Sequence, residues 1–391
     1  MKFDTIKLSE LAEIQTGPFG SQLHKEDYVV NGTPIVTVEH LGNRKFTEQN
    51  LPCVSDKDKE RLKKYMLKTG DIVFSRVGSV DRCSYVSAEY EGWMFSGRCL
   101  RVRPCEILNS EYLYYFFSLK ETKQFVRNIA TGATMPSINT KFMGEVPIRV
   151  PSMEAQNKIA SILWMIDDKI ELNEKINNNL EQQAKALYKN WFFDFSTFSS
   201  DGNLPDGWRL GTVGDIIQLH DSKRVPLSGA ERNKMAKVYP YYGAASRMDY
   251  VDSYLFDGIY LLLGEDGTVV DSLGFPILQY VYGQFWVNNH AHIITGKEGF
   301  SVEELYLLFS LTNIKSIVTG AVQQKVSQQN LKKVPAIIPG KEALDAFDEI
   351  IQPVFTQIRN LRDENANLAV LRDTLLPKLM SGELDVSDVD L

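Results

Sequence analysis

Cysteine is scarce in this chain of 391 residues, and its spacing argues against a metal site. The four cysteines, Cys53, Cys83, Cys99 and Cys105, form no C-x-x-C pair. Zinc sites that use cysteine are usually built from such pairs. We therefore expect free thiols in a reducing compartment, and no metal bound by this chain.

Long apolar runs are absent as well. No stretch approaches 20 apolar residues, and no charged and then apolar leader follows Met1. Membrane-spanning helices and secretory signals need those features. We expect a cytoplasmic protein that does not contact a membrane.

The motifs of the common catalytic classes are also missing. The sequence has no G-x-x-x-x-G-K-[ST] phosphate loop, no Asn/Asp-Pro-Pro-Tyr/Phe motif of amino-methyltransferases, no Gly-rich turn of a βαβ unit and no nucleophile elbow. Such motifs accompany ATP use, methyl transfer and hydrolysis. We expect a chain without catalytic residues, which disfavours a stand-alone methyltransferase or nuclease.

An excess of positive charge, the usual mark of a nucleic-acid binder, is likewise lacking, since the net charge is −7. Residues 340–391 alone hold 5 Lys and Arg against 11 Asp and Glu. Most of the negative excess therefore lies at one end of the chain. A local basic face elsewhere is compatible with the sequence, although composition does not demonstrate one.

What the chain does have is a strict repeat within residues 151–191. The residues of one helix face recur at alternating intervals of four and three positions, which is the spacing of the a and d positions of a coiled coil. We call this set of positions the seam. Ser152 is placed to cap a helix, and no Gly or Pro interrupts the run that follows. We expect one helix of about 40 residues. Its single apolar face needs a partner helix to pack against. The seam consists of Ile159, Leu163, Ile166, Ile170, Asn173, Asn177, Leu180, Ala184, Leu187 and Trp191.

That partner lies in the same chain, because the pattern recurs 188 residues later. Residues 131–191 match residues 319–379 without a gap at 14 of 61 positions, against roughly 4 expected by chance from average residue usage. This is an internal duplication. The second seam is almost wholly apolar and consists of Phe347, Ile351, Val354, Ile358, Leu361, Asn365, Leu368, Arg372, Leu375 and Leu379.

The duplication predicts an α+β protein with an internal pseudo-twofold repeat. Two mixed α/β domains are joined and spaced by two long antiparallel coiled-coil helices. The Ser-, Gly- and Asp-rich linker Ser196–Gly207 separates the halves. The predicted boundaries are residues 1–150 for the first domain, 151–195 for the first helix, 196–339 for the second domain, 340–383 for the second helix and 384–391 for an acidic tail.

Within the domains, short β-rich runs bounded by turn residues predict strands, and apolar clusters at helical spacing predict one helix each. The helices are expected at Glu111–Arg127 and Val302–Leu311. The strands are expected at Pro34–Val38, Asp71–Phe74, Ser84–Val86, Cys99–Val102, Gly258–Leu263, Phe275–Val281 and Ala291–Thr295. The ends of each domain and the long helices are duplicated, whereas the sequence in the middle of each domain differs. This favours two domains that recognise different targets over a coiled-coil scaffold alone.

Several side chains of the second domain are candidates for contact with DNA. The run around Tyr242 is either a plain strand-to-turn junction or a platform that places aromatic faces, Ser246 and Arg247 against DNA. Glu265 and Asp266 lie in a Gly-bounded turn, but carboxylates also accept hydrogen bonds from cytosine amino groups.

Two histidines of the second domain, His290 and His292, alternate along a predicted strand and would share one face. The two side chains lack a third metal ligand at recognisable spacing. They are either a buried, hydrogen-bonded pair or contacts to DNA.

In the first domain, Arg76 and Arg98 are candidates for phosphate or guanine contact, with a solvated surface arginine as the alternative for each. Four further candidates lie in the duplicated segments. These are Thr134, Lys141, Gln323 and Lys325.

The polar seam positions Asn173, Asn177 and Asn365 stand where Leu or Ile would stabilise most. A buried asparagine commonly fixes helix register at a cost in stability. The hypothesis is that these three pin the alignment of the helices; the alternative is that they tolerate exposure.

A series of short motifs, each weak alone, follows one order along nearly the whole chain and resembles the specificity subunit of type I restriction-modification systems. The motifs are Gly70-Asp71-Ile72-Val73 with Arg76 and Gly78, Gly132 to Asn139, Val146-Pro147-Ile148 with Pro151 and Gln156, Trp191-Phe192, Leu204-Pro205-Asp206-Gly207-Trp208, Tyr241-Tyr242-Gly243-Ala244, Gly264-Glu265-Asp266-Gly267, Asn288 to His292, and Leu371 to Leu379 with Ser381-Gly382.

The resemblance implies two target recognition domains that read a bipartite double-stranded DNA target. It also implies assembly with two modification (methyltransferase) subunits and, for cleavage, with restriction subunits. S-adenosylmethionine, ATP and Mg are then expected on those partners and no cofactor on this chain. Trp191, Phe192 and Phe193 are candidate docking residues for the modification subunits.

Overall fold

The computed structural model describes residues 2–20, 22–199, 203–320 and 322–389. The predicted linker and acidic tail therefore lie partly outside the described residues. The chain divides into two compact units. Unit 1 consists of Met1–Leu172 with Glu364–Leu391, and unit 2 of Asn173–Asp363.

The two long helices expected from the repeat are present as α6 (Met153–Phe192) and α11 (Lys341–Ser381). The Ser152 side chain caps α6 by accepting a hydrogen bond from the Ala155 amide at 3.3 Å. In unit 1 the helices run antiparallel, since Asp167 pairs with Arg372 while Lys169 pairs with Glu364. Each unit contains part of both helices.

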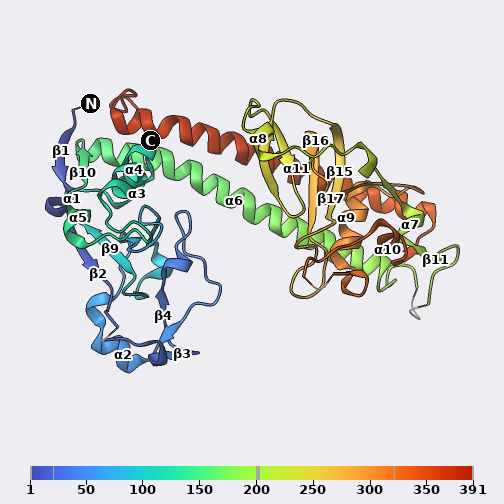
Figure 1. Ribbon diagram of the computed structural model, residues 1–391, viewed down its shortest axis with the longest axis horizontal. Coiled ribbons are helices and arrows are strands. Elements are labelled where there is room, and N and C mark those ends of the chain that lie inside the picture. Colours follow the sequence, from blue (N-terminus) through green and yellow to red (C-terminus); the bar gives the residue numbers. More distant parts are fainter. Residues whose placement is uncertain (1, 21, 200–202, 321, 390–391) are drawn as a thin grey trace. The chain divides into compact units, whose positions relative to one another are not determined.

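Unit 1 is built on three sheets (Figure 1), in which the named strands pair antiparallel except for the parallel pair of β4 and β8. One pair joins the start of the domain to its end, and a four-stranded sheet holds the centre with strand order β2-β9-β6-β7. A second sheet has the order β3-β5-β4-β8. The strands are β1 (Asp4–Lys7), β2 (Ala12–Thr16), β3 (Tyr28–Val29), β4 (Thr33–Val36), β5 (Cys53–Val54), β6 (Ile72–Ser75), β7 (Cys83–Tyr85), β8 (Met94–Phe95), β9 (Cys99–Pro104) and β10 (Pro147–Val150). The helices are α1 (Leu8–Leu11), α2 (Asp56–Arg61), α3 (Ser110–Ser118), α4 (Lys120–Ile129) and α5 (Thr140–Gly144).

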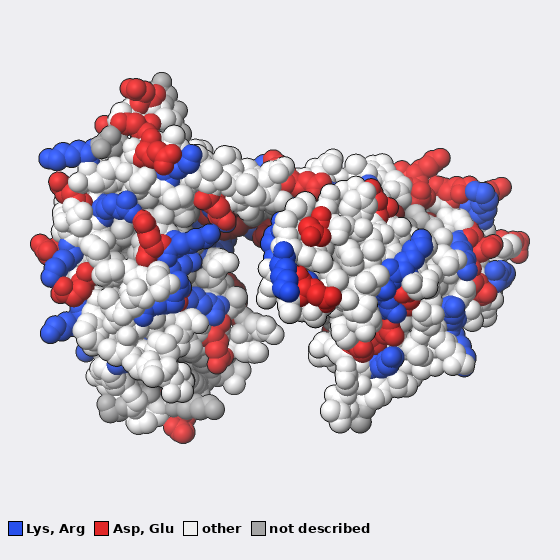
Figure 2. All heavy atoms as spheres, turned by 45° about the horizontal axis from the view of Figure 1, so that its top comes forward, with Lys and Arg blue, Asp and Glu red and all other residues white. Residues whose placement is uncertain are grey.

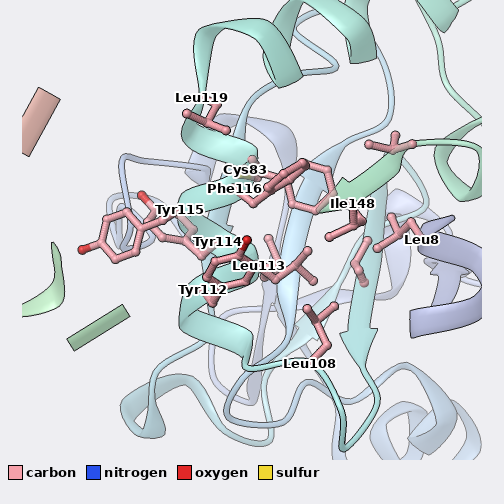
Figure 3. Close-up of a cluster of buried hydrophobic side chains, with 14 of the residues drawn as sticks. Leu8, Cys83, Leu108, Tyr112, Leu113, Tyr114, Tyr115, Phe116, Leu119 and Ile148 are labelled. Atoms are coloured by element: carbon pink, nitrogen blue, oxygen red, sulfur yellow. The ribbon is translucent and has the colours of Figure 1, made fainter. Parts of the chain in front are cut away.

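The core of unit 1 is organised by α3, whose residues Tyr112–Phe117 are all buried. Figure 3 shows Tyr112, Leu113 and Phe116 gathered with Leu8 and Ile148 from the flanking elements. Ile159 and Leu163 of α6 join this cluster. The part of the domain around α3 and the helices of unit 1 therefore share one apolar core, and the rest of the domain has a second cluster of its own.

The prediction of a single helix over Glu111–Arg127 is wrong. Leu119 has an extended backbone with ψ 135°, and this residue separates α3 from α4. Leu119 is itself buried, while α4 buries only Thr122 and Val126. Packing of Leu119 into the core, rather than a Gly or Pro, sets the break, so the sequence gives no signal for it.

Unit 2 repeats this plan around a larger sheet. Its six strands follow the order β12-β17-β15-β16-β13-β14, and a separate pair joins its start to its end. The strands are β11 (Arg209–Thr212), β12 (Ile217–Leu219), β13 (Tyr239–Tyr242), β14 (Arg247–Val251), β15 (Phe256–Gly264), β16 (Leu278–Val287), β17 (Ala291–Gly296) and β18 (Pro335–Ile338). The helices are α7 (Val213–Ile216), α8 (Gly229–Arg232), α9 (Val302–Leu311) and α10 (Gln328–Lys332). The predicted helix Val302–Leu311 is confirmed as α9.

Each unit also fastens its α/β domain to the long helices with the same combination of groups. In unit 1, Asp167 of α6 accepts hydrogen bonds from the Tyr115 hydroxyl at 2.7 Å and from Arg372 of α11 at 2.7 Å. In unit 2, Glu181 of α6 accepts from the Tyr306 hydroxyl at 3.0 Å and from Arg362 at 2.8 Å. One carboxylate thus ties a domain helix and α11 to α6 in both units.

None of the helices among the described residues combines the length and the apolarity that a membrane crossing requires.

Candidate nucleic-acid interface

The two units share a set of backbone hydrogen bonds at one end of their central sheets. In unit 1, the Arg76 amide donates to the Arg98 carbonyl at 2.8 Å, and the Ile138 amide donates to the Arg76 carbonyl at 3.0 Å. A third bond runs from the Gly78 amide to the Pro136 carbonyl. Three loops that are far apart in sequence are thereby fixed against one another.

Unit 2 repeats these bonds. The Glu265 amide donates to the His290 carbonyl at 2.8 Å, and the Val326 amide donates to the Glu265 carbonyl at 2.8 Å. The Gly267 amide donates to the Gln324 carbonyl. Arg76 is therefore equivalent to Glu265, and Arg98 to His290, which the sequence offset of 188 does not reveal.

We call these sets of loops edge 1 and edge 2. Edge 1 comprises residues 76–78, 97–98 and 131–137 of unit 1, and edge 2 comprises residues 265–267, 288–290 and 322–325 of unit 2. Gly78 and Gly267 adopt positive φ angles of 76° and 91°. Side chains other than glycine rarely adopt that conformation, which explains a glycine at both turns.

Edge 1 presents donors on a mostly exposed surface. Arg98 and Thr134 are exposed, whereas Arg76 is half-buried. Arg76 donates from Nη1 to the Gly97 carbonyl at 3.2 Å, and its guanidinium lies 5.6 Å from the centre of the exposed Phe19 ring. Lys141 is exposed on α5, shortly after the Ile138 contact.

Edge 2 carries both signs of charge. Lys325 and Gln323 are exposed, and the Lys325 ammonium lies 3.5 Å from Glu265. Asp266 accepts a hydrogen bond from His290 Nδ1 at 2.5 Å. The carboxylates of Glu265 and Asp266 are thus already engaged, which favours the presentation of Lys325 and His290 over acceptance from cytosine.

A hairpin turn adjoins edge 2 and brings in the remaining candidates. The Asn288 amide donates to the Tyr242 carbonyl at 3.0 Å, at the point where β13 enters the turn. Ser246 and Arg247 are exposed beyond it. Tyr242 is half-buried, with its ring 5.9 Å from that of Phe285. This position provides an aromatic face at the surface, so both alternatives for Tyr242 stay open.

The prediction that His292 faces DNA is wrong, because its ring is fully buried. Its Nδ1 lies 2.6 Å from Asp221 Oδ2, and its Nε2 lies 2.8 Å from the Val326 carbonyl oxygen. His290 lies in the turn before β17 and is held by a different carboxylate. The two histidines do not act as a pair.

Asp221 is a buried residue behind edge 2 that the sequence did not indicate. Burial raises its pKa, but the hydrogen bond and charge of His292, the Ile293 amide and the charge of Arg224 outweigh burial, so the pKa lies below its ordinary value. No motif surrounds Asp221, and only the fold brings it to His292. The Gln328 side chain also donates, from Nε2 to Asp221 Oδ2 at 2.5 Å.

The fold brings one of the two histidines, His292, close to two carboxylates that the sequence spacing did not indicate. Ligand atoms of Asp221, Glu265 and His292 lie within 4.8 Å of one another. The Arg224 guanidinium already lies among them, 2.6 Å from Glu265 and 3.6 Å from Asp221. With Lys325 also close to Glu265, the cluster already contacts cations of the protein itself, and the absence of a bound metal stays a prediction.

The predicted docking residues are largely inaccessible. Phe192 is buried, and its ring packs 5.0 Å from that of Phe347. Trp191 is half-buried and lies 5.4 Å from the same ring. This corrects the docking prediction for Phe192, because an aromatic group inside the core of unit 2 cannot offer a surface. Phe193 alone of the three is exposed.

Two of the three polar seam residues are buried, and the third, Asn365, is half-buried. Asn173 and Asn177 are buried, and Asn365 donates from Nδ2 to the Ile170 carbonyl at 3.2 Å. Tolerance of exposure does not fit the burial of Asn173 and Asn177. Their role in helix register stays a prediction.

Surface charge is mixed. On the face shown in Figure 2, Lys and Arg lie among Asp and Glu in both units rather than forming one continuous basic surface. On this face, affinity for a polyanion would depend on local groups of cations rather than on one broad basic surface.

Comparison with known proteins gives consistent matches over the whole chain. The family model "Type I restriction modification DNA specificity domain" matches residues 1–182 and 205–368. The chain is 26% identical to the type I restriction enzyme MjaIX specificity subunit of Methanocaldococcus jannaschii, over 99% of this chain and 94% of that protein. It is 24% identical to the HindI specificity subunit of Haemophilus influenzae, over 96% of this chain and 100% of that protein.

A solved structure shares the fold. The S subunit of a type I restriction-modification system from M. genitalium superposes with a TM-score of 0.62 at 17% identity. The match covers 97% of this chain and 96% of that one. The arrangement of two mixed α/β domains and two long helices is therefore found in both proteins.

Proposed function

We propose that edges 1 and 2 are the DNA-reading surfaces of this chain. The chain belongs to the family of type I restriction-modification DNA specificity subunits, which are not catalytic. Each unit would read one half of a bipartite double-stranded target, and α6 and α11 would set the spacing between the halves. The single observation that carries this proposal is the repetition of the same backbone bonds at both edges around different side chains.

The chemistry of the two edges supports an asymmetric target. Edge 1 places Arg98 where edge 2 places His290, and Arg76 where edge 2 places Glu265. Arginine recognises guanine through its O6 and N7 acceptors or binds phosphate, whereas a carboxylate that is held by cations does neither. Two frames that are alike but carry different side chains read different base sequences.

The reactions themselves belong to other subunits in this proposal. Two modification subunits would supply S-adenosylmethionine and the methylation of a flipped adenine, and restriction subunits would supply ATP- and Mg-dependent cleavage. This chain contributes sequence recognition and a frame for assembly. The exposed Phe193, directly after α6, and the exposed Val370 and Leu371 on α11 are available for subunit contact.

Removal of a contact side chain from one edge should impair recognition of one half of the DNA target only. We expect Arg98→Ala, in the complex with the modification subunit, to cost about 1–3 kcal/mol of binding and to relax sequence preference within one half-site, because a base or phosphate contact is removed. Lys325→Ala should act on the other half-site. The measurement is DNA affinity at several salt concentrations, combined with sequencing of methylated sites from a randomised library.

Matched controls for these variants are Lys63→Ala in unit 1 and Lys341→Ala in unit 2, which remove exposed cations remote in sequence from either edge. Neither control should change affinity or preference. If Arg98→Ala and Lys325→Ala alter the same half-site, or resemble the controls, the assignment of edges 1 and 2 is refuted.

A further inference from the structure

We propose that His292 and Asp221 are positioning residues that hold residues 322–326 of unit 2 in the conformation that reads DNA, although neither residue reaches the surface where DNA would bind. This inference rests on the proposed function of edge 2. It assigns half-site specificity partly to a buried pair rather than to contact residues alone.

The pair forms a closed set of hydrogen bonds. His292 donates from Nδ1 to Asp221 Oδ2 at 2.6 Å and from Nε2 to the Val326 carbonyl at 2.8 Å. Both partners are acceptors, so both ring nitrogens carry hydrogen when both bonds form. Asp221 Oδ1 accepts from the Ile293 amide at 2.9 Å, which fixes the carboxylate on β17.

These bonds act directly on the segment that carries Gln323 and Lys325. The Val326 carbonyl is held by His292, and the Val326 amide by the Glu265 carbonyl at 2.8 Å. On the far side, Gln328 donates to Asp221 at 2.5 Å. Val326 at the carboxyl-terminal end of the segment and Gln328 two residues later are thereby each bonded to a member of the His292–Asp221 pair.

The pair also sets the charges beside the segment. The Arg224 guanidinium, 3.6 Å from Asp221, donates to Glu265 at 2.6 Å and to the Ala291 carbonyl at 2.7 Å. Glu265 in turn lies 3.5 Å from the Lys325 ammonium. Loss of the charge on Asp221 would therefore change the position of Arg224 and, through Glu265, the position of Lys325.

Unit 1 lacks this arrangement at the equivalent place. Leu100 pairs with Phe74 across β9 and β6, as His292 pairs with Leu263 across β17 and β15. Leu100 is buried in the core. An apolar residue therefore suffices for the shared sheet, and the polar pair of unit 2 serves something particular to edge 2.

The test uses the full chain in complex with the modification subunit from its own cells, and sequences the sites that the complex methylates in a randomised library. His292→Leu introduces the residue that unit 1 uses. Asp221→Asn keeps the side-chain shape and the acceptor for Ile293, and it can donate to a singly protonated His292. Leu305→Ala on α9 removes a buried apolar side chain from the core of unit 2 and leaves the polar groups of the pair in place.

We expect His292→Leu to lower sequence preference about tenfold within the half-site that Lys325→Ala also alters, and to leave the other half-site unchanged. Asp221→Asn should lower this preference less, by about threefold, because it keeps a bond to Ile293 and can keep one to His292 while it loses the charge beside Arg224. Leu305→Ala should lower the yield of complex without changing either preference.

The inference is overturned if His292→Leu behaves like Leu305→Ala, with less complex and an unchanged target. It is also overturned if Asp221→Asn and His292→Leu are equally damaging. Should His292→Leu fail to assemble, Gln328→Ala decides, because it removes only one bond to Asp221 and must still weaken preference in the same half-site. If the unmodified complex shows no preference at all, the proposed function fails instead.

Discussion

Asp71→Ala is expected to lower the free energy of unfolding of unit 1 by about 3 kcal/mol, within the 3–5 kcal/mol typical of breaking a buried ion pair. The Asp71 carboxylate is almost fully buried and accepts two hydrogen bonds from Arg103, both at 2.6 Å. It also accepts from the Lys68 amide at 2.8 Å. Removal of the carboxylate leaves three donors without an acceptor.

The effect is placed at the low end of that range because a quarter of the Arg103 side chain is exposed, which lets water replace part of the lost interaction. The hydrogen bond to Asp71 raises the pKa of Arg103 above its ordinary value, although burial opposes this. The pair thus stabilises the charged arginine. Its place directly before β6 explains why the Gly70-Asp71 motif contains an aspartate.

Urea unfolding of Asp71→Ala and of Asp71→Asn measures the loss in the free energy of unfolding. Asp71→Asn, which keeps the shape and one acceptor, should lose less stability than Asp71→Ala. Asp56→Ala, at an exposed position in the same unit, serves as the control and should change stability by at most about 0.5 kcal/mol. Equal losses for Asp71→Ala and Asp56→Ala would contradict the pairing.

Glu304→Gln is expected to stabilise unit 2, and to do so more at high pH. Glu304 is fully buried near the start of α9, where the Ser301 amide donates to its Oε2 at 2.8 Å. Burial raises the pKa of Glu304 to about 8; the bonds from Ser301 oppose this, and the charges of Asp348 and Glu303 add to it. Glutamine retains the cap without an ionisable group.

The direction in which stability changes with pH follows from the raised pKa of Glu304. Below the ordinary value of 4.5 the carboxyl is protonated in both folded and unfolded chains, so no penalty exists. Between pH 4.5 and about 8 the unfolded chain ionises first, and folded stability declines with rising pH. Glu304→Gln removes this penalty, which amounts to at most about 4 kcal/mol at pH 8 and less than about 1 kcal/mol at pH 5.

Unfolding at pH 5 and pH 8 provides the measurement. The neighbouring Glu303 is a control of opposite sign, because it accepts from the Tyr280 hydroxyl at 2.6 Å and from Arg359 at 3.0 Å. Glu303→Gln should destabilise unit 2. A gain from Glu304→Gln that is the same at both pH values would show that Glu304 is ionised in the folded chain.

The long helices and the duplication could be predicted from the sequence because both depend on periodicity. The seam from Ile159 to Trp191 follows one rule over ten positions, so single exceptions such as Asn173 do not hide it. Strands that lead into edges 1 and 2, such as β6, β15 and β17, were also predicted, since they are apolar runs between turn residues, whereas β13 and β14 were not. Local patterns are thus sufficient for the frame.

The roles of individual site residues could not be predicted in the same way. Glu265 and Asp266 carry the charge expected of contact residues, but tertiary contacts with Arg224 and His290 engage them internally. Asp221 has no sequence signal because its partner is 71 residues away. Periodicity reports which face of an element is buried, whereas partners across a sheet depend on the complete fold.

The central claim is tested most directly by sequencing the DNA sites that the complex of this chain and its modification subunit methylates. Two domains with equivalent frames and different edges predict one asymmetric motif, with two specified halves separated by a gap of constant length. Methylation without a sequence motif, or a motif with two identical halves, would contradict the account.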